Sequence, residues 1–270
     1  GEPTFIVAQP DAPEWSTAAM GPEKLGYARR MTAKLIEKVY PGALAMQVFG
    51  KWYPGEPLPR WNFMTLDNPV APIWPETERL LFDDVAGSNT GAEVDALMQA
   101  IAKKLKLKKQ LFPAMEPAEQ GGSLAGLVLP LDYFDGVWLS ANWPYSKKNP
   151  IQLSCGDSPV GLRLPLEALS PALCRKALTI EVRNGAIEIF IPPLQWLGFS
   201  ALIHFLRGIV VDLDLKDIVI CGYAPSDTMG AVLTLGLAAD PGVLEVNLPP
   251  TNTWAEYDEV LKQSATAAAA

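Results

Sequence analysis

The fold class is decided by residues 177–192, whose sequence is ALTIEVRNGAIEIFIP. On both sides of Asn184-Gly185 the residues alternate between the two faces of an extended chain, which is the period-two pattern of a strand. The Asn-Gly pair favours the two positive φ angles of a type I′ turn. We therefore predict an antiparallel hairpin, with strands at Ala177–Arg183 and Ala186–Pro192 joined by a two-residue turn.

Outward from this hairpin, helical and extended patterns alternate irregularly. Helices are predicted at residues 22–39, 91–107, 199–213 and 254–261, and strands at residues 3–9, 44–49, 217–221, 231–237 and 243–247. Within Phe112–Pro150 only Gly126–Leu129 is predicted to be a strand, and the proline-rich segment Lys51–Trp61 is predicted to be a loop. This order favours an α+β fold, with helices packed against a mixed or antiparallel sheet. We expect a single domain over residues 1–263 and a small-residue, unstructured or artificially short tail at 264–270.

The composition excludes several classes of protein. The chain has 270 residues, a formal net charge of −8 and 49% hydrophobic residues, as expected for a folded protein with a real core. An acidic chain lacks the basic face that binding to nucleic acid requires. The one dense basic run, Lys103–Lys109, is interpreted as a solvated helix end whose lysines complement the helix dipole.

Compartment signals favour the cytoplasm. The three cysteines form no CxxC pair, which fits a reducing compartment and offers neither a disulfide framework nor a zinc site. No signal peptide is visible at Gly1-Glu2. The longest apolar stretch, Trp196–Val211, contains His204 and Arg207 and is too short to span a bilayer, so we expect no membrane partner.

Several common catalytic motifs are absent from the sequence. Neither GxGxxG nor GxxxxGK[ST] occurs, so a dinucleotide fold and a P-loop lack local support, and GxSxG is also absent. The chain has one histidine, His204, within an apolar helical run. A satisfied core or interface histidine is the better interpretation of that position than a catalytic base.

Four segments place charged or amide side chains beside glycine and proline. They are Gly1–Phe5 (GEPTF), Lys51–Trp61 (KWYPGEPLPRW), Gly156–Pro165 (GDSPVGLRLP) and Asp240–Asn247 (DPGVLEVN). Taken singly, each has a structural explanation: a terminal residue, a surface loop with ion pairs at its rim, a capped turn or a solvent-facing strand. Taken together, carboxylates at strand ends and cations on stiff loops favour a site for an anionic, metal-bound substrate. In the last segment, alternation puts Glu245 and Asn247 on one face of a strand.

These four segments resemble signature stretches of a bacterial amidoligase family, and the resemblance spans Gly1 to about Leu261. In that family the domain commonly follows a transglutaminase-like domain in a longer protein. The family is thought to resemble glutamine synthetase and the carboxylate–amine ligases in fold. The resemblance therefore implies a glutamine-synthetase-like sheet and an enzyme that uses ATP and Mg²⁺ to join a carboxylate to an amine through an acyl phosphate.

The resemblance also implies roles for particular residues. Glu2 and Glu245 become the metal ligands, and Glu2, Arg60 and Arg163 the catalytic residues, with the arginines contacting phosphate or carboxylate. The residues expected to bind substrate or ATP are Lys51, Trp52, Glu56, Asp157 and Asn247. The substrates would be a carboxylate and an amine, including peptides, and the expected macromolecular partners are a second copy of the chain or the remainder of a longer protein.

The chain departs from the family pattern in four places, one of which is a segment between Met115 and Gly126 that is shorter than expected. The family continues Glu-Val-Asn with an apolar residue, His and Pro, whereas here Leu248 is followed by Pro249 and Pro250. Cys221 stands where the family tends to have Glu, and the later glycine-rich stretch ending in Asn-His is absent. These departures motivate an alternative, in which the chain is a catalytically degenerate amidoligase-like module. It would dock a partner through exposed aromatic residues such as Trp138, Trp143 and Tyr145.

Overall fold

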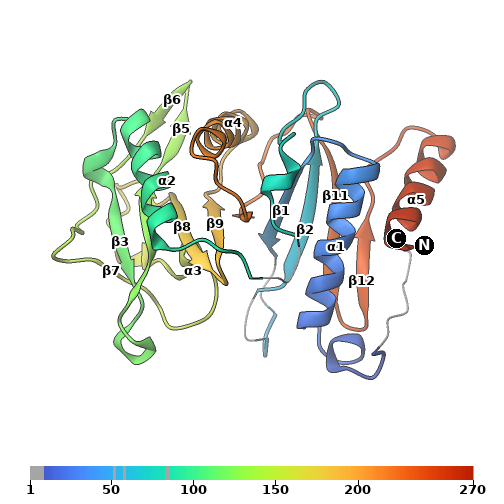
Figure 1. The fold of residues 1–270 in the computed structure, drawn as a ribbon, viewed down its shortest axis with the longest axis horizontal. Helices are drawn as coiled ribbons and strands as arrows, with labels where there is room; N and C mark the ends of the chain where they lie inside the picture. The colour runs from blue at the N-terminus through green and yellow to red at the C-terminus, as the bar shows by residue number, and fades with distance from the viewer. Residues whose placement is uncertain (1–8, 51–52, 57–58, 83–85, 270) are drawn as a thin grey trace. The chain divides into compact units, whose positions relative to one another are not determined.

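The structure, a computed structural model, describes residues 9–50, 53–56, 59–82 and 86–269 (Figure 1). Helices and strands combine in an α+β fold, as predicted. Contacts divide the chain into two compact units. Unit 1 comprises residues 1–77, 82–85 and 228–270, and unit 2 comprises residues 78–81 and 86–227. The single domain predicted for residues 1–263 remains a prediction.

Unit 1 is an antiparallel sheet with helices packed against it. Its elements are α1 (Pro22–Lys38), β1 (Leu44–Phe49), β2 (Trp61–Asp67), β11 (Leu233–Asp240), β12 (Val243–Asn247) and α5 (Trp254–Ala269). The strands lie in the order β12-β11-β2-β1, and each neighbouring pair is antiparallel. Helix α1 contacts β1, β2 and β11, and α5 packs against α1.

Unit 2 contains a mixed sheet in the order β10-β9-β8-β4-β3-β7. Its strands are β3 (Phe112–Met115), β4 (Leu124–Pro130), β7 (Ile151–Gln152), β8 (Ala177–Arg183), β9 (Ala186–Ile191) and β10 (Ile218–Gly222), and a separate pair is formed by β5 (Asp132–Phe134) and β6 (Val137–Leu139). The helices are α2 (Gly91–Lys104), α3 (Val160–Arg163) and α4 (Trp196–Asp212). Helix α4 connects the parallel strands β9 and β10, and α2 packs against β4 and β8.

The predicted hairpin is present as β8 and β9. Asn184 and Gly185 have φ angles of 49° and 73°, the signs that a type I′ turn requires. The register pairs Glu181 with Glu188 across the two strands. The turn is also held from outside, because the backbone N–H of Gly87 donates to the Asn184 carbonyl at 2.9 Å. The sequence pattern that decided the fold class is therefore confirmed.

Other predicted elements are confirmed, most of them with shifted ends, and the prediction for one region is wrong. Strand β1 has the predicted residues, and α1 and α2 lie within their predicted ranges. In the region 112–150, where only Gly126–Leu129 was predicted to be a strand, the structure also has β3, β5 and β6. Prolines and glycines obscured these short strands, although proline is tolerated at the edge of a sheet.

The C-terminal tail prediction is also wrong. Helix α5 does not stop near Leu261 but continues to Ala269, and Ser264 and Ala267 are buried. The small residues there are good helix formers, and their size lets the helix approach its neighbour closely. The predicted strand at residues 3–9 lies, except for Gln9, outside the described residues. The described part of the predicted loop at residues 51–61 is irregular up to Trp61, where β2 begins.

Candidate functional site

One face of the unit 1 sheet carries polar side chains from β2 and β12. The register pairs Ala238 with both Asn62 and Glu245, and it pairs Gly236 with Asn247. Directly paired residues share a face of a sheet, as do residues two apart in one strand. Asn62, Glu245 and Asn247 therefore lie on one face, and we call these three residues the unit 1 polar face.

Gly236 lets the side chains of Asn62 and Asn247 approach the backbone closely in the middle of this face. A Cβ atom at Gly236 would lie 3.1 Å from Asn62 Oδ1 and 3.6 Å from Asn247 Cβ. Asn62 Oδ1 is buried, and no described residue donates a hydrogen bond to it. A buried carbonyl oxygen without a donor costs free energy. Within the described part of the chain, Asn62 Oδ1 therefore has an unused acceptor position, which a hydrogen-bond donor or a cation could occupy.

Arg60 immediately precedes β2, and two carboxylates hold its guanidinium. Nη2 donates to Glu56 Oε1 at 2.7 Å, and Nη1 forms an ion pair with Asp240. The guanidinium carbon also lies 4.1 Å from the ring centroid of Tyr53, a cation–π contact. The hydrogen bond to Glu56, opposed by partial burial, raises the pKa of Arg60. The guanidinium is therefore charged and fixed in place beside the polar face.

A buried lysine supports the C-terminal end of β11, where Asp240 lies. Lys24 is fully buried, and its Nζ donates to the backbone carbonyls of Asp240 at 2.7 Å and Ala19 at 2.9 Å. Burial lowers the pKa of Lys24 to about 8, although the charges of Glu14 and Asp240 act in the opposite direction. Lys24 thus fixes the backbone of Asp240, whose carboxylate holds Arg60.

The structure places the described predicted site residues in both units. Glu2, Lys51 and Trp52 lie outside the described residues. Unit 1 holds Glu56, Arg60, Glu245 and Asn247. Asp157 and Arg163 belong to unit 2.

Sequence reasoning missed three residues of the unit 1 site. Asn62 directly follows the proline-rich loop, and recognising Trp61–Asp67 as a strand would have placed Arg60 and Asn62 on one face. Asp240 stood at the start of a quoted segment but received no role. Lys24 gave no signal, because a lysine in the first turn of a helix usually points to solvent.

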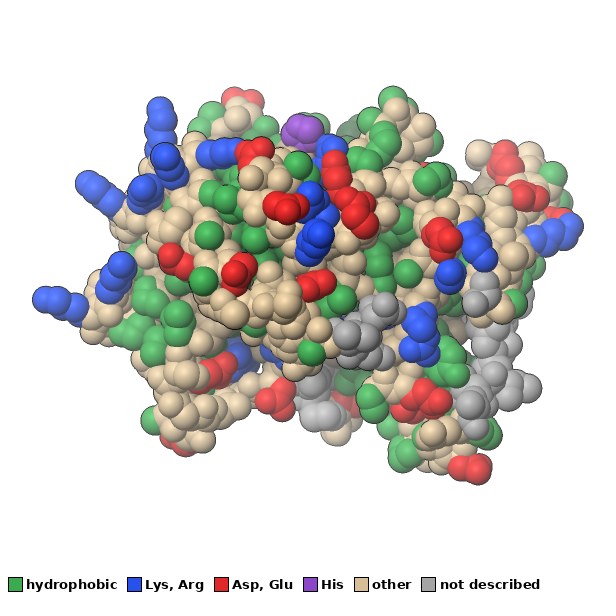
Figure 2. All heavy atoms as spheres, viewed as in Figure 1, with side chains coloured by type: hydrophobic (Ala, Val, Ile, Leu, Met, Phe, Trp, Pro, Cys, Tyr) green, Lys and Arg blue, Asp and Glu red, His purple; other side chains and the backbone are tan. Residues whose placement is uncertain are grey.

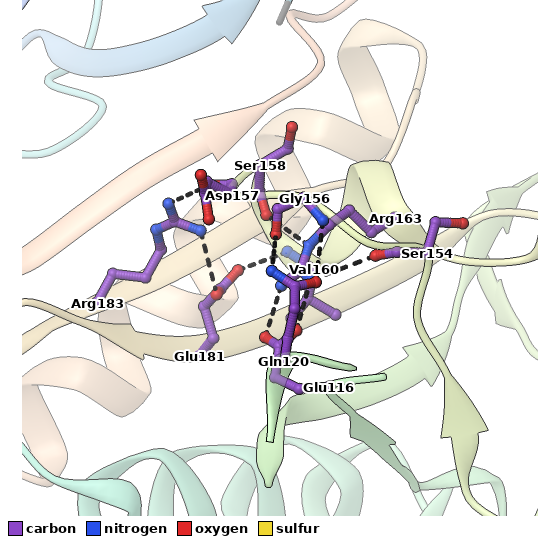
Figure 3. A network of polar contacts seen from close by, with 10 residues as sticks. All are labelled: Glu116, Gln120, Ser154, Gly156, Asp157, Ser158, Val160, Arg163, Glu181 and Arg183. Carbon is purple, nitrogen blue, oxygen red and sulfur yellow. Dashed lines mark hydrogen bonds and ion pairs between the residues drawn. The ribbon is translucent and has the colours of Figure 1, made fainter. Parts of the chain in front are cut away.

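Unit 2 has a separate polar cavity, which we call the unit 2 cavity (Figure 3). Its volume is about 360 Å³. The charged and amide side chains that line it are Glu116, Gln120, Asp157, Arg163, Glu181 and Arg183. Gln120 and Gly156 are joined by two hydrogen bonds of 3.0 and 3.3 Å, which tie the loop before α3 to the segment after β3.

Arg163 is bound within the protein in this structure. Its Nη1 and Nη2 donate to the two carboxylate oxygens of Glu116 at 2.6 and 2.8 Å, and its Nε donates to the Ser158 carbonyl at 2.8 Å. The paired guanidinium holds the pKa of Glu116 below its usual range. Arg163 thus makes a bidentate contact with a carboxylate of the chain itself.

Glu181 is the most deeply buried carboxylate of the cavity. It is 4% exposed, and its Oε1 accepts a hydrogen bond from the backbone N–H of Val160 at 2.6 Å. Burial, together with the charge of Glu188, raises the pKa of Glu181 to about 7. Arg183 Nη1 lies 3.6 Å from Glu181 Oε2, and Arg183 Nη2 donates to the Asp157 carbonyl. Glu181 therefore titrates near neutral pH.

Two predictions about single side chains need correction. His204 was expected in a core or an interface; because it is exposed on α4 it is not a core residue, whereas a place in an interface stays a prediction. Of the aromatic residues expected to be exposed, Trp143 is 4% exposed and stacks on Phe112. Trp138 packs on Tyr133 inside the β5–β6 pair, and Tyr145 packs against Trp143.

Surface charge, the length of apolar helices and groups of possible metal ligands also bear on function. Lys and Arg side chains project from the face shown in Figure 2 among acidic ones, and the lysines of the run 103–109 are exposed, as predicted. Within the residues that the structure describes, no helix is both long and apolar enough to cross a bilayer. The same described residues contain no group of three His, Cys, Asp or Glu side chains placed to hold a metal.

Comparison with known proteins gives a family. The model of the family DUF2126, described as "Putative amidoligase enzyme", matches residues 1–120 and 170–270. The chain belongs to this amidoligase family. The resemblance seen in the sequence is therefore confirmed, and with it a general ligase role.

The match has a gap that bears on the unit 2 cavity. Residues 121–169 are not matched, so the segment Gly156–Pro165 lies outside the part that the amidoligase family model covers. No curated protein and no solved structure matched the chain. The likeness to the glutamine synthetase fold therefore remains a prediction.

Proposed function

We propose that the chain is an ATP-dependent carboxylate–amine ligase that binds nucleotide phosphates and Mg²⁺ at the unit 1 polar face. The observation that carries this proposal is the placement of Asn62, Glu245 and Asn247 on one sheet face beside the fixed guanidinium of Arg60. Oxygen donors beside a held cation suit a phosphate chain with its metal. Membership of the amidoligase family supports the same chemistry.

The donor atoms of the polar face fit Mg²⁺. This ion takes oxygen ligands, keeps several waters, and needs only one or two protein carboxylates together with substrate phosphates. Asn62 Oδ1 is buried and lacks a donor among the described residues, as a ligand oxygen would. Glu245 and Asn62 would hold the ion, with Asn247 beside them. When bound, Mg²⁺ would neutralise charge on the phosphates.

The remaining residues have roles that follow from their contacts. In the first half-reaction a carboxylate oxygen of the substrate attacks the γ-phosphorus, and ADP leaves. In the second, the amine nitrogen attacks the acyl carbon, inorganic phosphate leaves, and the amine loses a proton. Arg60 would stabilise the charge on the transferring phosphoryl group. Glu56, Asp240 and Lys24 would act as positioning residues, because they hold Arg60 and the strand end rather than the substrate.

Nucleotide binding tests the proposal. Calorimetry on the full chain should show binding of a non-hydrolysable ATP analogue that requires Mg²⁺. Glu245→Gln should weaken it by about tenfold or more, because the variant loses a charged ligand. Glu37→Gln, at an exposed carboxylate on α1, is the matched control and should leave the affinity unchanged. If the folded wild-type chain binds no nucleotide with Mg²⁺ present, the proposal is wrong.

One observation favours the alternative, a degenerate amidoligase-like assembly module. The β5–β6 pair exposes apolar side chains, with Phe134 72%, Val137 58% and Leu139 46% exposed. Exposed apolar patches of this kind mark interaction surfaces. Light scattering would test this function. A monomer that turns over ATP by itself excludes it, whereas an oligomer that Phe134→Ser dissociates supports it.

A further inference from the structure

The unit 2 cavity carries more negative than positive charge. Its lining includes the carboxylates of Glu116, Asp157 and Glu181 and the guanidiniums of Arg163 and Arg183. A further carboxylate, Glu188, is paired with Glu181 across the hairpin. Carboxylates therefore outnumber guanidiniums four to two around this cavity. A surface cavity with excess negative charge attracts a cation.

The carboxylates of this cavity are neutralised unevenly by its two guanidiniums. Arg163 and Glu116 satisfy each other by two hydrogen bonds, of 2.6 and 2.8 Å. Arg183 is shared, since it donates to the Asp157 carbonyl and lies 3.6 Å from Glu181 and 3.5 Å from Glu188. The charges of Glu181 and Asp157 are thus only partly compensated.

Glu181 presents an incompletely bonded oxygen to the cavity. Its side chain is nine-tenths buried and lines the cavity, and its Oε1 is used by the N–H of Val160. Its Oε2 lies 3.6 Å from Nη1 of its cationic neighbour Arg183, which is beyond a hydrogen bond. Figure 3 shows Glu181 lying between Arg183 and Val160, with Asp157 on the far side of Arg183. Oε2 therefore has an ion-pair partner in Arg183 but, among the described residues, no hydrogen bond comparable to the 2.6 Å one that Oε1 accepts from Val160.

The chemistry of the donors selects the class of ligand. A divalent metal fits poorly, because the guanidiniums of Arg163 and Arg183 lie among the carboxylates and would repel a doubly charged ion. An anion would meet the excess negative charge. A volume of about 360 Å³ lies in the range of small-molecule sites. We propose that the unit 2 cavity binds a small molecule through its primary ammonium group, with Glu181 Oε2 as the buried acceptor and Asp157 at the mouth.

The titration of Glu181 agrees with this assignment. Burial and the neighbouring charge of Glu188 raise its pKa to about 7, so the empty cavity holds the carboxylate only partly ionised at neutral pH. A bound ammonium would restore the ionised form, because an opposite charge nearby lowers the pKa of a carboxyl.

The cavity is built from two kinds of segment. Glu116, Gln120, Glu181 and Arg183 lie in the part that the amidoligase family model matches, whereas Gly156, Asp157 and Arg163 lie in the gap. The wall carrying Asp157 is therefore the part of the cavity that the family model leaves unmatched, and it would select the substituent that the ammonium carries. The site does not depend on the proposed ligase activity.

An NMR titration of the isotope-labelled full chain tests the inference. The probes are glycinamide, which has an ammonium and no carboxylate, glycine, acetate and MgCl₂. Glycinamide should bind saturably and shift the Val160 amide, whose N–H donates to Glu181. Glycine distinguishes a simple amine site from an amino-acid site. Weaker binding of glycine indicates a simple amine, and tighter binding indicates an amino acid, with both sharing the ammonium contact.

Variants make the test specific. Glu181→Gln keeps an oxygen for the Val160 N–H but removes the charge, and it should weaken glycinamide binding by about tenfold. Asp157→Asn, at an exposed position, should weaken it less and serves if Glu181→Gln does not fold. Glu167→Gln, an exposed carboxylate outside the cavity, is the matched control. Saturable binding of acetate or Mg²⁺ instead of glycinamide, or binding unaffected by both cavity variants, would overturn the inference.

Discussion

At the scale of single residues, the β8–β9 hairpin places two carboxylates against each other. Glu181 and Glu188 are paired in the register, and Arg183 lies 3.6 and 3.5 Å from them. One guanidinium cannot fully neutralise two carboxylates away from water. The buried one, Glu181, responds by holding its proton to about pH 7. The neighbouring thiol of Cys221 is buried and has its pKa raised well above its usual value, so it does not titrate in the same range.

The first prediction is that stability falls as pH rises from 5 to 7.5. The folded pKa of Glu181 is about 7 against a reference of 4.5, so the folded state binds a proton that the unfolded state releases. This contribution is fully present below the unfolded pKa and is lost as pH rises through about 7. The loss is on the order of 3 kcal/mol at most. Urea unfolding from pH 5 to pH 7.5 measures it.

Glu181→Gln isolates the residue responsible. A neutral side chain cannot lose a proton, so the variant should gain stability relative to the wild type as pH rises. Glu167→Gln, exposed in the same unit, should keep the wild-type dependence. Lys24, with a pKa of about 8, titrates above the chosen range. A wild-type slope that persists in Glu181→Gln would assign the pH dependence to another group.

The residues of the candidate site were only partly predictable. Arg60, Glu245 and Asn247 carried a signal because charged and amide groups stood beside proline or alternated on a strand. Lys24 gave none and Asn62 gave only an indirect one, since their importance lies in burial and in neighbours distant in the chain. Such contacts arise only when the sheet register is known, and the sequence shows no register between strands far apart.

At the scale of elements, the N-terminus of α1 is capped by a residue outside the helix. Glu14 is buried, and its carboxylate accepts hydrogen bonds from the backbone N–H groups of Glu23 at 3.2 Å and Lys24 at 2.7 Å. The N-cap residue, Gly21, has no side chain, and a Cβ there would lie 2.4 Å from Glu14 Cδ. The cap is therefore supplied by Glu14, and Gly21 leaves it room.

The second prediction concerns this cap. Glu14→Ala should destabilise the chain by roughly 1–3 kcal/mol, because two helix N–H groups lose their acceptor and the buried Lys24 loses a nearby opposite charge. Urea unfolding measures the change. Glu37→Ala, exposed near the C-terminal end of the same helix, should have a much smaller effect on stability. Equal losses in the two variants would show that the cap contributes nothing specific.

The third prediction concerns the end of α5. Ser264 and Ala267 are 1% and 2% exposed, so residues after Gln263 belong to the packed structure. Deleting residues 264–270 should lower the free energy of unfolding by about 1–2 kcal/mol, through lost burial and lost helix length. Deleting only residues 268–270 is the control, since it keeps both buried residues. Thermal unfolding with no difference between the two deletions would contradict the packing of this turn.

Elements with a strong local signal were predicted well. The hairpin has Asn-Gly, α1 has a proline in its first turn, and α2 has a capping box from Thr90 and Glu93. Strands β3, β5 and β6 have no such signal, because each is only three or four residues long and is set by pairing with neighbours. The α+β class could thus be predicted from one hairpin, but the sheet order could not.

At the scale of the whole molecule, the chain assembles two units from segments that are not consecutive. Unit 1 takes its strands from both ends of the sequence, and unit 2 takes nearly all of its residues from the middle. The polar face with Arg60 lies in unit 1, and the cavity with Glu181 lies in unit 2. The contacts that hold Arg60 and those that hold Glu181 involve different residues.

The fourth prediction follows from this separation. Mutations that share no partner have independent effects, so each binding site should respond only to its own variant when one ligand is present at a time. Glu181→Gln should weaken glycinamide but leave the affinity for the Mg²⁺–nucleotide analogue within about twofold, and Glu245→Gln should do the reverse. Calorimetry for the nucleotide analogue and NMR titration for glycinamide, each on both variants, measure these four affinities. A variant that weakens both ligands while the chain stays folded would mean that the two sets of residues act as one site.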